Sequence, residues 1–272
     1  MGAARVRSSA SHGERALIEG ARSPSFAVLF LSLALGGCGG GAPLLHPAHV
    51  LPPSGVTVGA GLSGQLALKP LPPQSTPGST NDGPLQELGV APGVAPWVGG
   101  RMGLEGNNEL GLTYAGRALR LDVRHAFSFG RGSLSVGLGG SAVMARRPGS
   151  GSDVSGVFGG GGDVPLLIGW RSASDIYSVW FGPRAGFEVV GGRLQIGEGG
   201  AASSLGVDAR HYYGMLVAGA RVGFRHVHVA IELDAAYHHV DGTFTGKGAA
   251  GTTSTNVQQI TVTPAGALGV SF

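Results

Sequence analysis

The stretch Val227-His-Val-Ala-Ile-Glu-Leu-Asp-Ala-Ala-Tyr-His-His239 decides the fold class, because apolar and polar residues alternate along it. The odd positions from Val227 to Tyr237 are all apolar, whereas both carboxylates, Glu232 and Asp234, fall at even positions. Successive side chains of a β-strand point to opposite faces of the sheet. The stretch therefore predicts a strand with one apolar face and one polar face.

The same period of two recurs from Gly55 onward, and no segment there shows a sustained helical period. The preceding stretch, 212–225, alternates in the opposite phase, and the phase changes across Arg225-His226, as it does in a tight hairpin. A turn at Ala115-Gly116 divides 109–127 into two strands. The ten predicted strands lie within 55–68, 94–105, 109–127, 133–145, 163–172, 176–190, 212–225, 227–239 and 257–272.

The predicted connections alternate in length, apart from the tight turn near Gly116. Transmembrane β-barrels have an even number of strands, with short turns at one end and longer loops at the other. The pattern therefore predicts an all-β, antiparallel, up-and-down transmembrane barrel over 55–272. An eight-stranded barrel beginning near Val94 and a soluble periplasmic β-domain are the alternatives. Short connections are predicted at 106–108, 128–132, 173–175 and 225–226, and long ones at 69–93, 146–162, 191–211 and 241–256.

Aromatic residues favour a membrane barrel over a soluble sheet, because they lie on the apolar phase near the strand ends. Ten residues separate Tyr177 from Phe187, which spans roughly 25 Å in a strand tilted by about 40°, the height of the apolar band of such barrels. The last strand alternates up to Phe272. It resembles the C-terminal signal of outer-membrane barrel proteins, which implies that the barrel-assembly machinery recognises Phe272.

The N-terminal region has the layout of an export signal. Four arginines precede the apolar run Phe26–Leu35, which is too short for the roughly 20 residues that cross a bilayer as a helix. The tetrad Leu35-Gly36-Gly37-Cys38 resembles the lipobox of bacterial lipoproteins. This resemblance implies that residues 1–37 are a signal peptide and that Cys38 is acylated.

The lipobox resemblance also predicts where the mature chain resides. It implies passage through the lipoprotein-export machinery, and Gly39 stands where an aspartate retains many lipoproteins at the inner membrane. Residues 38–54, rich in Gly and Pro, are predicted to be the lipidated N-terminus and a flexible tether. The protein is therefore expected to be lipid-anchored and membrane-spanning in the outer membrane, with lipid as a partner.

Composition excludes several classes of protein. Four of the 19 basic and two of the 16 acidic residues lie within 1–37, so the remaining chain has a net charge near +1 and no basic surface for nucleic acid. Cys38 is the only cysteine, so disulfides cannot stabilise the fold. The 52 glycines and the low charged fraction of 13% suit many strands and turns with a partly apolar exterior.

The polar face of the strands is expected to line the lumen of the barrel. Its positive and negative charges nearly balance, and buried charges are costly unless they are paired. The sequence therefore predicts a largely plugged lumen with a network of ion pairs. The residues expected to line it are Arg101, Glu105, Glu109, Arg120, Asp122, Arg124, Arg171, Arg184, Glu188, Arg221, Arg225, Glu232 and Asp234.

These expectations favour a structural or surface-interaction role toward an unidentified extracellular partner. A narrow small-solute channel is the second interpretation. A lipid-modifying outer-membrane enzyme is the third, but no serine and histidine stand at a recognisable spacing, so no catalytic residue is predicted. No cofactor or metal is predicted either, because the match Gly59-Ala-Gly61-Leu-Ser-Gly64 lacks a following helix and no third ligand accompanies His226-Val-His228 or His238-His239.

Overall fold

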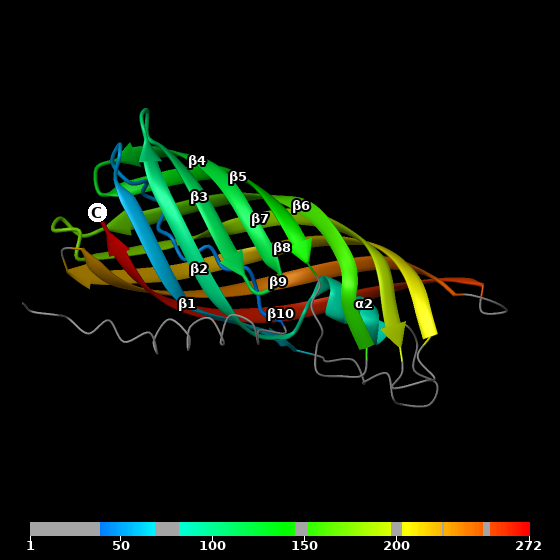
Figure 1. Ribbon diagram of the computed structural model, residues 1–272. Coiled ribbons are helices and arrows are strands. Elements are labelled where there is room, and N and C mark those ends of the chain that lie inside the picture. The colour runs from blue at the N-terminus through cyan, green and yellow to red at the C-terminus, as the bar shows by residue number, and fades with distance from the viewer. Residues whose placement is uncertain (1–38, 69–81, 145–151, 197–202, 225, 247–250) are drawn as a thin grey trace, which may run out of the picture.

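The computed structural model describes residues 39–68, 82–144, 152–196, 203–224, 226–246 and 251–272. Within them, ten antiparallel strands form one closed barrel, in which β1 (Val56–Ala67) pairs with β10 (Thr252–Ser271) (Figure 1). The predicted ten-stranded up-and-down barrel is confirmed, and the eight-stranded alternative is wrong. The other strands are β2 (Gly93–Leu104), β3 (Asn108–Ala115), β4 (Ala118–Phe129), β5 (Gly132–Met144), β6 (Ser152–Arg171), β7 (Tyr177–Ile196), β8 (Ser203–Phe224) and β9 (Val227–Thr245).

The two ends of the barrel differ. One end, called the short-turn end here, carries the turns that follow β2, β4, β6 and β8, and it also holds both ends of the barrel chain, because the Phe272 amide donates to the Val56 carbonyl at 2.8 Å. Its β2–β3 turn has positive φ at Gly106 and Asn107, as the tight hairpin turns that match strand twist require. The opposite end is called the long-loop end.

Strands β6 to β10 extend further toward the long-loop end than the sequence predicted. Residues 152–162, most of 191–211 and much of 241–256 belong to strands, so the long loops predicted at these places are wrong. The cause is a reversal of side-chain polarity along the strands, which hid the continuation of the alternating pattern.

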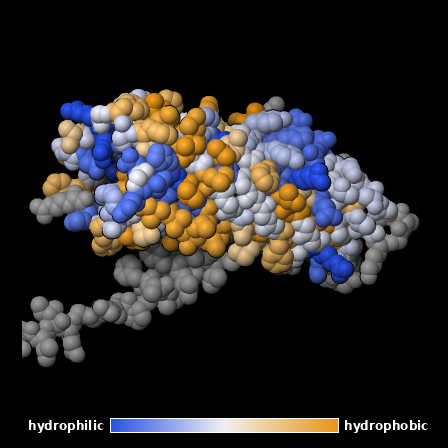
Figure 2. All heavy atoms as spheres, turned by 90° about the horizontal axis from the view of Figure 1, so that it is seen from above, coloured by the Kyte–Doolittle hydropathy of each residue, from blue (hydrophilic) through white to orange (hydrophobic). Residues whose placement is uncertain are grey.

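This reversal is clearest in β9. In its first part the outward Ile231 is 60% exposed while the inward Glu232 is 3% exposed. Beyond His239 the inward side chains become apolar, as at Val240 and Phe244, and the outward ones polar, as at Asp241. Figure 2 shows the same change on the surface: apolar side chains gather around the middle of the barrel and paler, more polar ones cover the part where β6 to β10 extend.

A short helix, α2 (Asp82–Gly89), fills the extended part of the barrel (Figure 1). Its Leu85 and Leu88 are fully buried in one apolar cluster with Val240 and Phe244. Gly242 lies against the helix, since a Cβ atom there would be 2.4 Å from Cδ1 of Leu85. The sequence did not predict this helix, because two leucines in eight residues make no sustained helical period. The described residues contain no helix long and apolar enough to cross a membrane.

Residues 39–54 run through the inside of the barrel and are called the inner segment (Figure 1). Most of residues 39–49 are buried, including Leu44 and Leu45. The flexible tether predicted over 38–54 is therefore wrong for residues 39–54, which are held inside the barrel. Cys38 and the predicted signal peptide 1–37 lie outside the described residues. The segment begins with small residues, Gly39 to Ala42, and its larger side chains from Leu44 to His49 are themselves buried in the lumen.

The polarity reversal predicts how arginine substitutions on β9 affect stability. Leu233→Arg places a charge in the middle of the outward apolar band and should lower the free energy of unfolding by about 2–4 kcal/mol in lipid vesicles. Thr245→Arg, on the same outward face beyond the band, should change it by less than about 0.5 kcal/mol. Urea unfolding followed by heat-modifiable gel migration measures both. Equal effects of the two variants would contradict the assignment of the band.

Candidate functional site

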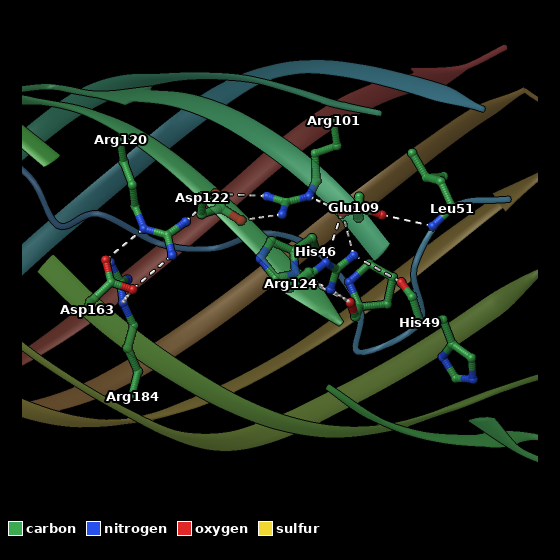
Figure 3. Close-up of polar contacts among 11 residues, drawn as sticks. His46, His49, Leu51, Arg101, Glu109, Arg120, Asp122, Arg124, Asp163 and Arg184 are labelled. Atoms are coloured by element: carbon green, nitrogen blue, oxygen red, sulfur yellow. Dashed lines mark hydrogen bonds and ion pairs between the residues drawn. The ribbon is translucent and has the colours of Figure 1, made fainter. Parts of the chain in front are cut away.

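The lumen holds a chain of buried ion pairs, and Asp163 on β6 lies near one end of it (Figure 3). The carboxylate of Asp163 accepts hydrogen bonds from Nε and Nη2 of Arg120 at 2.8 Å each, and from Nε and Nη2 of Arg184 at 3.1 and 3.2 Å. Two guanidinium groups from β4 and β7 thus share one carboxylate. Such paired geometry offsets the desolvation of charges in a narrow lumen.

The chain continues toward the short-turn end through β2, β3 and β4. Arg120 also contacts Asp122, which accepts from Arg101, and Arg101 in turn contacts Glu109. Glu109 Oε1 then accepts from Nε of Arg124 at 2.9 Å. Because basic and acidic groups alternate along this path, each carboxylate meets two guanidinium groups.

The inner segment is bound to the barrel wall through its backbone, first at Glu232 on β9. Oε1 of Glu232 accepts from the Leu44 amide at 2.5 Å and Oε2 accepts from the Leu45 amide at 2.9 Å. Leu45 has a φ of 52°, an uncommon value for a residue with a side chain. Nε1 of Trp180 donates to the same carboxylate at 3.0 Å.

Arginines and a second carboxylate hold the rest of the inner segment. Nη1 of Arg184 donates to the Ala42 carbonyl at 2.6 Å, and Nη2 of Arg124 donates to the His49 carbonyl at 3.0 Å. The Leu51 amide donates to Oε2 of Glu109 at 2.8 Å (Figure 3). Buried backbone groups that cannot reach water need such partners. The charged side chains of the barrel wall therefore satisfy backbone hydrogen-bonding groups of the extended segment.

Another cluster fastens α2 near the long-loop end. The guanidinium of Arg117 contacts the Leu88 carbonyl, donates to the Gly89 carbonyl at 3.0 Å, and pairs with Glu188 at 2.5 Å. A cation at the last carbonyls of a helix satisfies groups that have no partner within the helix. Arg117 therefore couples α2 to the wall strand β7.

Glu188 also begins a row of hydrogen bonds across the lumen. It lies 3.0 Å from Nδ1 of His211, His211 Nε2 lies 2.9 Å from Nδ1 of His238, and His238 Nε2 lies 2.8 Å from the Thr261 hydroxyl. An acid, two imidazoles and a hydroxyl in sequence resemble the parts of a nucleophilic site. Thr261 is 0% exposed, however, so a substrate cannot reach its hydroxyl.

Little space remains beside the inner segment. Two cavities in the lumen each have a volume of ≈ 40 Å³, one lined by Trp97 and His49 and the other by Asp234 and His238. A cavity needs roughly 10–15 Å³ for each water molecule, so each of these accommodates a few waters. Nε1 of Trp97, which lines the first cavity, and Oδ1 of Asp234, which lines the second, are buried and have no hydrogen-bond partner among the described residues.

Most residues predicted to line the lumen do so, with a few corrections. Glu105 is exposed in the β2–β3 turn, because the strand ends one residue before it, and Arg171 is exposed at the end of β6. Arg221 does face the lumen near the short-turn end, where it lines the same cavity as Trp97 and lies 3.6 Å from Asp175, and Arg225 lies outside the described residues. The structure places Arg101, Glu109, Arg120, Asp122, Arg124, Arg184, Glu188, Glu232 and Asp234 in the lumen.

Sequence reasoning missed some members of the site. Asp163 is the first residue of its predicted strand, and its inward position follows from the alternation with Val164, which is outward. Strand alternation could not identify Arg117, which lies in the β3–β4 turn, or His46, which lies in the inner segment. In the described part of the chain, no three His, Cys, Asp or Glu side chains come together as metal ligands.

Comparisons with known proteins add similar folds only. No protein-family model matches the chain, and no curated protein matches it. Neisserial surface protein A is similar at 10% identity over 80% of this chain and 96% of its own, with a TM-score of 0.32. The monoaromatic hydrocarbon channel CymD is similar at 10% identity over 81% and 89%, with a TM-score of 0.27. The strand pairing of the chain itself defines its class, a closed ten-stranded β-barrel with a filled lumen.

The ion-pair chain predicts a large effect from the carboxylate that Arg120 and Arg184 share. Asp163→Ala leaves the guanidinium groups of Arg120 and Arg184 buried without their shared partner, and should lower the free energy of unfolding by about 3–5 kcal/mol. Glu105→Ala removes an exposed carboxylate and should change it by less than about 0.5 kcal/mol. Urea unfolding of both variants in vesicles tests this. An Asp163 variant as stable as the Glu105 variant would contradict the pairing.

Proposed function

We propose that this chain is an outer-membrane β-barrel lipoprotein with a closed lumen and a structural or surface-interaction role. The observation that carries the proposal is the inner segment, whose backbone binds Glu232, Glu109, Arg124 and Arg184 across the lumen. A solute path would need this volume to be open. The nearly balanced ion pairs around the segment favour a rigid interior over a route for ions.

The outward face supports a location within a membrane. Large apolar side chains cover it, including Leu121, Leu138, Phe181 and Leu216, each at least half exposed. A contiguous apolar surface of this kind is unfavourable in water but suits the hydrocarbon core of a bilayer. Since the barrel closes without a free edge, its backbone hydrogen bonds are satisfied in lipid.

The C-terminal strand supports assembly by the outer-membrane machinery. Phe272, the residue expected to be recognised, is 76% exposed at the short-turn end, where a receptor for β10 can reach it. Leu268 and Ile260 continue the outward apolar row on the same strand. The lipobox tetrad Leu35–Cys38 supports passage through the lipoprotein-export machinery.

A closed lumen predicts the electrical behaviour of the protein. In planar bilayers the unmodified protein should show no stable conductance. Glu232→Ala removes the acceptor of the Leu44 and Leu45 amides, which costs at least about 1.5 kcal/mol, so brief openings should become roughly tenfold more frequent. Glu105→Ala is the matched control and should stay silent. Steady conductance of the unmodified protein would support the small-solute channel and refute the closed lumen.

The lipoprotein assignment predicts acylation at a single position. Cells fed a palmitate analogue should label the protein, and Cys38→Ala should abolish the label because it removes the thiol that is acylated. Ser32→Ala, within the apolar run, should keep it. Gel fluorescence of the purified protein measures the label. Undiminished labelling of the Cys38 variant would refute the lipid anchor.

A further inference from the structure

The inner segment crosses the lumen in a defined direction. Its first residues lie at the long-loop end: the Gly40 amide donates to the Ala91 carbonyl at 2.9 Å, just before β2 begins. A Cβ atom at Gly116, in the β3–β4 turn, would lie 2.9 Å from the carbonyl oxygen of Gly39. Both neighbours belong to the same rim of the barrel.

The last residues of the inner segment lie at the opposite end. The Ser54 amide donates to the Gly103 carbonyl at 3.0 Å, near the β2–β3 turn, and His49 Nε2 lies 3.2 Å from the Arg131 carbonyl in the β4–β5 turn. The chain then enters β1 beside Phe272. The inner segment is therefore one additional crossing, which separates Gly39 from the C-terminus.

The number of crossings fixes which side each end occupies. Ten strands return the barrel chain to the side from which it started, so Val56 and Phe272 share the short-turn end. One more crossing places Gly39 at the long-loop end. In outer-membrane barrels the short turns are periplasmic and the longer loops extracellular.

The rim at Gly39 lies at the edge of the apolar band. Strands β2 to β4 are short there, and their outward side chains stay apolar to the rim, as at Val94, which is 60% exposed, and Leu119. Cys38 is joined to Gly39, and consecutive Cα atoms are about 3.8 Å apart. Acyl chains at this position would reach the bilayer beside β2 to β4 without a spacer.

We infer that the mature chain enters the barrel from the extracellular face, so that its acylated N-terminus anchors in the outer leaflet of the outer membrane. The presence of a lipid anchor and of the outer membrane rests on the proposed function. The side of the membrane on which the anchor lies rests on the path of the inner segment. The inner segment connects a surface lipid anchor to a barrel whose C-terminus is periplasmic.

Paired cysteines test whether the segment is threaded in this direction. A Cβ atom at Gly41 would lie 3.0 Å from Cβ of Thr263, and one at Gly169 would lie 3.0 Å from Cβ of Ala48. Gly41→Cys with Thr263→Cys, and Ala48→Cys with Gly169→Cys, should each form a disulfide on mild oxidation in cells. The mismatched pair Gly41→Cys with Gly169→Cys should not. Disulfides in neither matched pair would overturn the threading.

Epitope insertions in the full chain test the side of the membrane. An epitope between Cys38 and Gly39 should bind antibody on intact cells, as should one after Gly251 at the long-loop end. An epitope after Gly130, in a short turn, should bind only after permeabilisation. Both Gly130 and Gly251 have positive φ and open space around them, so they tolerate an insertion.

The outcomes separate the inference from the function on which it rests. An N-terminal epitope hidden on intact cells while the Gly251 epitope is accessible would overturn the inference alone. Accessibility of the Gly130 epitope with a hidden Gly251 epitope would overturn the orientation of the barrel. Loss of the palmitate label in Cys38→Ala reports on the lipid anchor independently of either result.

Discussion

The structure depends on the pairing of charges inside a closed sheet. A barrel in a membrane turns its polar side chains inward, where little water is left to solvate them. Asp163, Glu109 and Glu232 each meet several donors, from arginine side chains or from backbone amides. The pairing therefore fixes the positions of strands, inner segment and side chains together.

The inner segment and the charged wall depend on each other. An extended chain has unsatisfied amides and carbonyls along its whole length, and a barrel lined only by apolar groups could not bind it. Glu232 accepts from two consecutive amides, and Arg124 donates to carbonyls on the same segment. Without the segment, Glu232 would lose the Leu44 and Leu45 amides and keep the hydrogen bond from Trp180.

At the long-loop end the distribution of polar and apolar side chains is the reverse of that in the middle of the barrel. There the outward side chains of β6 to β10 become polar, as at Asp241, and their inward ones form an apolar core with Leu85 and Leu88. The same strands thus carry two opposite patterns, and the change occurs near His239 on β9. Arg117 joins the two parts, because it binds the end of α2 and pairs with Glu188.

The sequence by itself determined the features that follow from local alternation and covalent order. The period of two in 227–239 predicted strands, and the polar face of the strands identified most of the lumen residues. The even number of strands predicted that the first and last strands begin and end at the same rim of the barrel. The lengths of β6 to β10 could not be predicted in the same way, because the inversion of polarity looks like the end of a strand when the surrounding solvent is unknown.

Only the tertiary structure decided the position of the inner segment and the partners in the network. Residues 39–54 have the composition of a tether, and nothing local distinguishes a chain in water from one bound in a lumen. The difference arises from carboxylates and arginines more than 50 residues away along the chain, as in the contact between Leu51 and Glu109. Closure of the barrel brings these groups together, so the path of the segment is a property of the closed sheet and not of its own sequence.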